Sequence, residues 1–135
     1  MENIKQYFVD TEGQGTLGTA SAEGKVNMAL YSKPFFLGGD DQLSFVMAKK
    51  LSFRNVQENP HACYLFVESG RGYQGCRIYL RCIEVNEDSS RINQLMEESG
   101  YEFSTAQGVN DAALVTFHIE GTVPLVGQTV AHKKG

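Results

Sequence analysis

Short apolar runs of strand length, separated by turn residues, are the feature that most constrains the fold of this 135-residue chain. The predicted strands cover residues 15–22, 25–37, 42–48, 63–68, 75–85 and 113–126. Turn signals such as Glu23-Gly24 separate the runs, which favours antiparallel neighbours joined by short connections. Pro34 falls inside the second run, so we expect the far end of that strand at an edge or a bulge.

Three segments between these runs have helical patterns. Residues 2–10 form a short leading helix, and residues 52–59 form a second helix with Ser52 as the expected N-cap and Pro60 as its stop. Residues 88–99 give the clearest amphipathic pattern, and Gly100 stands at the stop position. Six strands with two or three short helices predict a mainly β fold, a six-stranded antiparallel barrel with helices at its ends.

Length and composition indicate one domain, residues 1–135, that can build a core of its own. The net charge of −4 disfavours nonspecific binding to nucleic acid. The sequence has no signal-peptide core and no apolar run of membrane-spanning length, so neither export nor a membrane partner is expected. Three cysteines without CxxC spacing argue against a disulfide framework and suit a reducing cytoplasm.

The stretch from Met47 to Val56 carries the strongest chemical signal. The strand-like run 43–48 ends in Lys49 and Lys50, and Ser52 begins a short helix. Backbone N–H groups at a helix start, a hydroxyl group and two ammonium groups are the donors that a phosphate needs. The alternative is an ordinary helix start after a solvated lysine pair. The phosphate interpretation predicts a phosphorylated small-molecule ligand.

Several stretches together resemble the FMN-binding split barrel of the pyridoxamine 5′-phosphate oxidase-like family. Thr16-Leu17-Gly18-Thr19-Ala20-Ser21 with Gly24 and Val26-Asn27-Met28-Ala29 is similar to the first hairpin of that family. Residues 52–60 are similar to its phosphate-loop helix, and Gln74-Gly75-Cys76-Arg77-Ile78 to its fifth-strand signature. The resemblance covers most of residues 15–85 and rests on the order and spacing of these motifs.

The resemblance implies a homodimer in which two FMN molecules lie at the interface, each lined by both protomers. It places Asn27, Met28, Ala29 and Leu30 along the flavin and its ribityl chain, and Ser52 and Asn55 at the phosphate. It also brings Gln74 toward the ring from the fifth strand. Without the resemblance, Asn27 would be a polar residue on a wet strand face and Gln74 a loop residue.

This chain departs from the family at Leu51-Ser52, because many relatives carry a lysine or arginine directly before or at the Ser52 position, whereas the charges here are at Lys49 and Lys50. The phosphate is then met by Lys49, Lys50, Arg54 or mainly by backbone N–H groups. The three histidines, His61, His118 and His132, are scattered without ligand spacing, so no metal site is predicted.

The sequence therefore predicts an FMN-binding flavoprotein, either an oxidoreductase or an electron carrier, with no catalytic acid or base identified. A haem- or deazaflavin F420-binding module on the same fold is the alternative, and haem would need one of the three histidines as its axial ligand. A flavin-free dimeric barrel with a structural role is the third possibility.

Overall fold

The computed structural model describes residues 3–70, 72–99 and 111–127. Its helices and strands follow one another as α1 (Ile4–Asp10), β1 (Gly13–Ala20), β2 (Val26–Tyr31), β3 (Gln42–Ala48), α2 (Leu51–Glu58), β4 (His61–Glu68), β5 (Gly75–Asn86), α3 (Ser89–Ser99) and β6 (Ala112–Pro124). The described residues thus contain six strands and three helices, where the sequence predicts six strands with two or three short helices. No described helix is long and apolar enough to cross a membrane.

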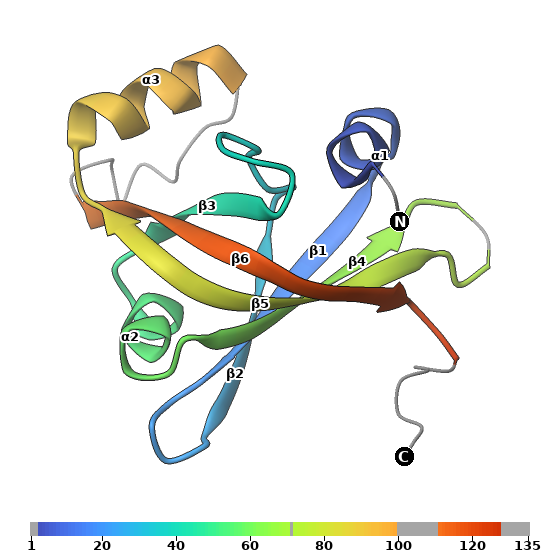
Figure 1. The fold of residues 1–135 in the computed structure, drawn as a ribbon, viewed down its shortest axis with the longest axis horizontal. Helices are drawn as coiled ribbons and strands as arrows, with labels where there is room; N and C mark the ends of the chain where they lie inside the picture. Colours follow the sequence, from blue (N-terminus) through green and yellow to red (C-terminus); the bar gives the residue numbers. More distant parts are fainter. Residues whose placement is uncertain (1–2, 71, 100–110, 128–135) are drawn as a thin grey trace.

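All six strands belong to one antiparallel sheet in the order β2-β1-β4-β5-β6-β3. The sheet curls on itself as a half-barrel, so its two edge strands approach each other across the core (Figure 1). Tyr31 at the end of β2 and Phe45 in β3 meet edge to face, with ring centroids 5.5 Å apart. The predicted six-stranded antiparallel split barrel is confirmed.

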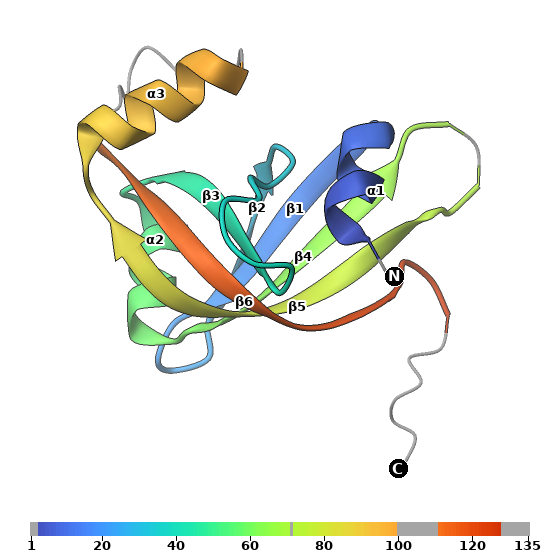
Figure 2. The same ribbon diagram turned by 45° about the horizontal axis from the view of Figure 1, so that its top comes forward.

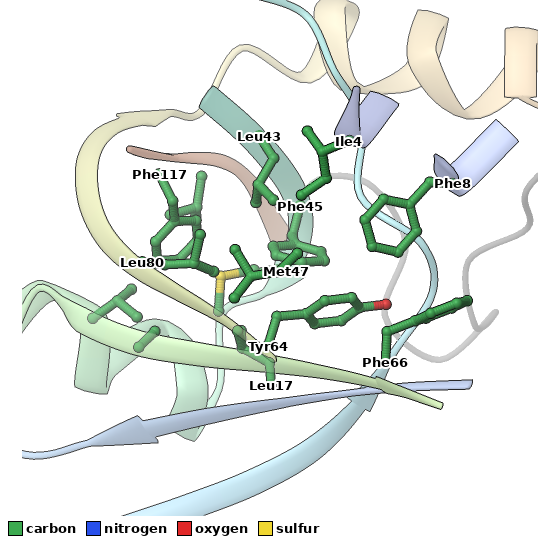
Figure 3. Packing of buried hydrophobic residues seen from close by; sticks show 14 of the residues in the cluster. Ile4, Phe8, Leu17, Leu43, Phe45, Met47, Tyr64, Phe66, Leu80 and Phe117 are labelled. Carbon is green, nitrogen blue, oxygen red and sulfur yellow. The ribbon is translucent and has the colours of Figure 1, made fainter. Parts of the chain in front are cut away.

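The hollow side of the curled sheet holds the main core. Alternate side chains of each strand point inward, as the two-residue period of a strand requires. Figure 3 shows Tyr64 and Phe66 of β4 packed beside Phe8 of α1, with Leu17 and Phe45 nearby. A second cluster fastens α3 onto the other side of β3 and β6, and it consists of Val46, Ile92, Leu95, Met96, Ala112 and Leu114. The two clusters bury both faces of β3.

The second predicted strand is too long at its C-terminal end. β2 ends at Tyr31 rather than continuing to residue 37. Pro34 has no N–H to give to a ladder, and beyond it only an isolated bridge between Phe35 and Ser44 remains. The segment 32–41 therefore crosses between the two edge strands, visible in Figure 2 as the loop in front of β3.

The first helix and the strand that follows it also differ from the bounds predicted from the sequence. α1 covers Ile4–Asp10 rather than residues 2–10, and β1 covers Gly13–Ala20 rather than residues 15–22. The Lys33 ammonium group donates to the carbonyl oxygens of Phe8 at 2.9 Å and Thr11 at 3.0 Å. A cation at a helix C-terminus binds carbonyl groups that have no partner within the helix. Lys33 therefore stabilises the end of this seven-residue helix.

Candidate functional site

The corner between β3 and α2 places basic residues at an uncapped helix start. Lys50 is the N-cap of α2, and no side chain caps this helix. Within the described residues, the backbone N–H groups of Leu51, Ser52 and Phe53 have no acceptor. α1, by contrast, has Asn3 as a side-chain cap. The first turn of α2 therefore presents free donors and the positive end of its dipole.

Ser52 is not the N-cap that the sequence predicts, because it already lies inside the helix. Its hydroxyl oxygen accepts a hydrogen bond from Asn27 Nδ2 at 3.2 Å instead of binding the first-turn amides. Ser52 is 7% exposed, so the helix start lies against β2. Asn27 and Ser52, separated by 25 positions, are brought together as the resemblance implies.

Asn55 lies one turn further along α2 and is 3% exposed. Its Nδ2 donates to Thr19 Oγ1 of β1 at 3.1 Å. Its Oδ1 has no donor among the described residues, although a buried amide oxygen normally accepts at least one hydrogen bond. The polar side of α2 thus faces β1 and β2 with an unused acceptor beside the helix start.

The three basic residues that could bind an anion here differ in their surroundings. The Lys49 ammonium group is paired with the Glu87 carboxylate before α3. Lys50 and Arg54 are exposed and have no ion pair among the described residues. Arg54 lies about 200° around the helix from Ser52, on the face turned away from Asn27. Lys50 is thus the nearest unengaged cation at the helix start.

The four residues of β2 that were assigned to the flavin alternate between two faces. Asn27 and Ala29 are half-buried on the side of α2, whereas Met28 is 65% and Leu30 72% exposed on the opposite side. Their side chains therefore cannot all line one ligand, although the backbone of β2 can contact a ligand along its length.

A hollow of about 440 Å³ lies on the outer side of the sheet next to β2. Its floor is β1, which contributes only small side chains at Thr16, Gly18 and Ala20 on this face. β2 and β4 form its two sides. The lining is largely apolar and includes Asn27, Met28, His61, Cys63 and Leu65.

Gln74 lies away from this group within one chain. Its carbonyl oxygen accepts from Glu68 N at 2.9 Å, at the hairpin that joins β4 to β5. Glu68 pairs with Gly13, whereas Ala62 pairs with Thr19 beside Asn55. Six residues of strand separate these rows, about 20 Å. Gln74 could contribute to the site only from another protomer.

His61, which the sequence gives only as one of three candidate haem ligands, lines the hollow. It begins β4 and lies opposite Arg81 of β5. Glu120 of β6 accepts from Arg81 Nε at 3.1 Å, and its other oxygen lies 3.9 Å from His61 Nδ1. The correct pairing register of β4, β5 and β6 would have predicted that His61, Arg81 and Glu120 lie together. That register depends on β-bulges, which the sequence alone does not reveal.

The other two histidines are placed differently. His118 Nδ1 lies 3.5 Å from Asp41, at the β3–β6 edge, and does not line the hollow. His132 lies outside the described residues. Among the described residues, no group of three or more histidine, cysteine or acidic side chains is arranged to hold a metal ion.

All three cysteines are free thiols. Burial raises the pKa of Cys63 and Cys82, and the neighbouring Arg77 partly opposes the shift at Cys63. Burial, followed by the charges of Glu68 and Cys63, raises the pKa of Cys76 to about 11. These thiols are therefore protonated near neutral pH and are poor nucleophiles.

No family model and no curated protein matches the chain. Solved structures match it over most of its length. An FMN-binding protein from Syntrophomonas wolfei superposes with a TM-score of 0.74 at 15% identity, covering 95% of this chain and 87% of that one. An F420 reductase gives a TM-score of 0.67 at 12% identity, covering 87% of this chain and 94% of that one.

HutZ, a haem storage protein from Vibrio cholerae, gives a TM-score of 0.64 at 17% identity, covering 90% of this chain and 91% of that one. Proteins provisionally assigned as pyridoxamine 5′-phosphate oxidases, from Lactobacillus delbrueckii and Listeria innocua, are also similar. Identities this low show a common fold and leave the ligand to be argued from the residues of this chain.

Proposed function

Because the chain has the split-barrel fold found in FMN-binding and pyridoxamine 5′-phosphate oxidase-like proteins, we propose that it is a flavoprotein that binds FMN. The observation that carries the proposal is the uncapped start of α2, where Asn27, Ser52 and Asn55 meet beside Lys50. A fold hosts many functions, so the local donor set is the stronger argument.

The residues present fit a phosphate group. The free N–H groups of the first turn of α2 and the Ser52 hydroxyl group can donate to phosphate oxygens. Lys50 supplies a positive charge without first breaking an ion pair, whereas Lys49 must leave Glu87. Bonds between charged donors and phosphate are among the strongest hydrogen bonds in proteins.

The edge strand β2 supplies the next part of the proposed site. Asn27 and Ala29 face the same side as Ser52, so the ribityl chain and ring would follow this strand away from the phosphate. Gln74 would come from a second protomer, because it is remote from Ser52 within one chain. The proposed assembly is therefore a homodimer with two FMN sites at its interface.

Bound FMN would supply hydride- or electron-transfer chemistry, so the protein is proposed to act as an oxidoreductase or an electron carrier. The residues of this chain would anchor the phosphate, orient the ring along β2 and exclude water at the interface. Raised cysteine pKa values argue against a thiolate in this chemistry. Location in the reducing cytoplasm stays a prediction from the sequence.

A haem- or F420-binding module is the second candidate. His61 favours haem, because it lines the apolar hollow with Nδ1 turned toward Glu120. A carboxylate near one ring nitrogen is a common way to orient histidine and leave the other nitrogen free for iron. An F420 reductase has a similar fold, so a deazaflavin is a further ligand to compare with FMN and haem.

Absorption spectroscopy separates these candidates. Protein as purified is scanned for flavin, deazaflavin and haem bands, and any released cofactor is identified by mass. Apoprotein is then titrated separately with FMN, F420 and haem. FMN binding that weakens in Asn27→Ala supports the flavin proposal. A haem band lost in His61→Ala and kept in His118→Ala would favour the haem candidate.

A further inference from the structure

A carboxylate that precedes α3 occupies one of the two lysines at the start of α2. The Glu87 carboxylate accepts a hydrogen bond from the Lys49 ammonium group, and Lys49 directly precedes Lys50, the N-cap of α2. The two segments meet because β3 and β5 both pair with β6 and end on the same side of the sheet, as Figure 1 shows. The chain thus places an anion of its own beside the proposed phosphate site.

Glu87 is held in position by the residues on both sides of it. Asn86 pairs with Leu114 of β6, and its Oδ1 accepts from Asp88 N at 2.8 Å. Asp88 in turn caps α3, since its Oδ1 accepts from Ser90 N at 3.0 Å. The backbone that carries the Glu87 side chain is therefore fixed before any ligand arrives.

The backbone on the lysine side is fixed as well. Ala48 pairs with Ala112 of β6, and Lys49 N donates to the Asp111 carbonyl oxygen at 2.8 Å. Two anchored segments lose little freedom when their side chains pair, so the contact between Lys49 and Glu87 forms without rearrangement of either segment.

The pair is also exposed enough for a stronger anion to compete with it. The side chains of Lys49 and Glu87 are 34% and 54% exposed, and ion pairs as open as this are weak. A phosphate carries more charge than a carboxylate, and it would also meet the free N–H groups of the first turn of α2. While the pair is closed, the charge of Lys49 is neutralised and Glu87 repels an approaching phosphate.

We propose that Glu87 is an internal competitor for the phosphate site, which competes with the phosphate of FMN for Lys49 and so lowers the affinity of the site. This inference rests on the proposed function and adds a residue that regulates its anion site. Lower affinity in related complexes is mostly faster dissociation, so Glu87 keeps the bound cofactor exchangeable.

Two titrations of the full chain at one low ionic strength test the inference. Binding of FMN is followed by flavin fluorescence, and binding of inorganic phosphate by the NMR shifts of the Leu51, Ser52 and Phe53 amides. Glu87→Gln is expected to lower both dissociation constants about fivefold, because it releases a cation for a charge-assisted bond. In a Lys49→Ala background the same substitution should bring no gain, since the residue competed for is gone.

Glu97→Gln is the matched control, because it removes the same charge from an exposed position on α3 that has no ion pair among the described residues. Wild-type affinity in Glu87→Gln, an equal gain in Glu97→Gln, or a gain that persists without Lys49 would overturn the inference. Phosphate binding that tightens in Glu87→Gln, by protein that does not bind FMN, contradicts only the proposed function. Absence of phosphate binding in every variant would contradict both.

Discussion

Asn55 joins α2 to the sheet through one buried amide. Replacing Asn55 with alanine removes the bond to Thr19 Oγ1 and leaves that hydroxyl group without this partner. We expect a loss of about 1–2 kcal/mol in the free energy of unfolding, measured by urea denaturation. Gln57→Ala, on the exposed side of the same helix, should stay within about 0.5 kcal/mol of the wild type. Equal losses in both variants would show that the buried bond is unimportant.

The two neighbouring lysines should differ in their effect on FMN. Lys50→Ala removes an unengaged charge at the start of α2, and we expect the FMN dissociation constant to rise about tenfold or more. Lys49→Ala should have a smaller effect, because Glu87 already occupies that ammonium group. Fluorescence titration of each variant measures the difference. A larger effect at Lys49 would mean that phosphate displaces Glu87 and that Lys50 is a bystander.

The buried thiol of Cys76 should make stability depend on alkaline pH. Burial raises its pKa to about 11 in the folded protein from an ordinary value of 9.0, so folding favours the protonated form. This contribution is complete below pH 9 and is lost as pH rises toward 11. Urea denaturation between pH 8 and about pH 10.5 should show a steeper decline for the wild type than for Cys76→Ala. Parallel declines would contradict the assignment.

At the scale of elements, Gly15 and Gly18 of β1 differ in the space that a side chain would have. A Cβ at Gly15 would overlap the hydroxyl group of Tyr64, whereas one at Gly18 meets nothing closer than 3.6 Å. Tyr64 is fully buried and donates to the Ser32 carbonyl oxygen at 3.0 Å, so it cannot move aside. Gly15→Ala should cost about 1–3 kcal/mol or more, and Gly18→Ala about zero, in thermal or urea unfolding. Similar stabilities for the two variants would contradict this account of the packing.

The sequence predicts the elements well where apolar periodicity is regular. The side of α3 formed by Ile92, Leu95 and Met96 is buried as expected. The prediction fails where tertiary contacts decide. β2 stops at Tyr31 although Phe35 and Phe36 continue the apolar run, because these aromatic residues pack from the crossing segment instead.

The candidate site, like the helices and strands, could be predicted only in part from the sequence. The resemblance brings Asn27, Ser52 and Asn55 together, and the structure does so too. A cap assignment from local sequence could not foresee that Asn27, 25 positions earlier, would bond to the Ser52 hydroxyl group. The position of His61 beside the hollow could not be predicted, because its neighbours there come from other strands. One segment of sequence does not determine the register and the bulges with which those strands pair.

At the scale of the whole molecule, the curled sheet separates three environments. The inner side is a packed aromatic core, the corner at α2 collects polar donors, and the outer side of β2, β1 and β4 is apolar and open. Figure 1 shows α2 between the edge strand β3 and the ends of β1 and β4, where it closes one end of the half-barrel. The edge strand β2 borders the corner at α2, which is why we expect cofactor binding and the proposed dimer contact to meet there.

Whether the protein binds FMN is decided by titrating the apoprotein with FMN and following flavin absorbance and fluorescence. We expect saturable binding of about one FMN per chain, with affinity that falls in Lys50→Ala and Asn27→Ala and is retained in Val9→Lys. Absence of binding up to about 1 mM FMN, by protein that is folded and free of other cofactors, would contradict it.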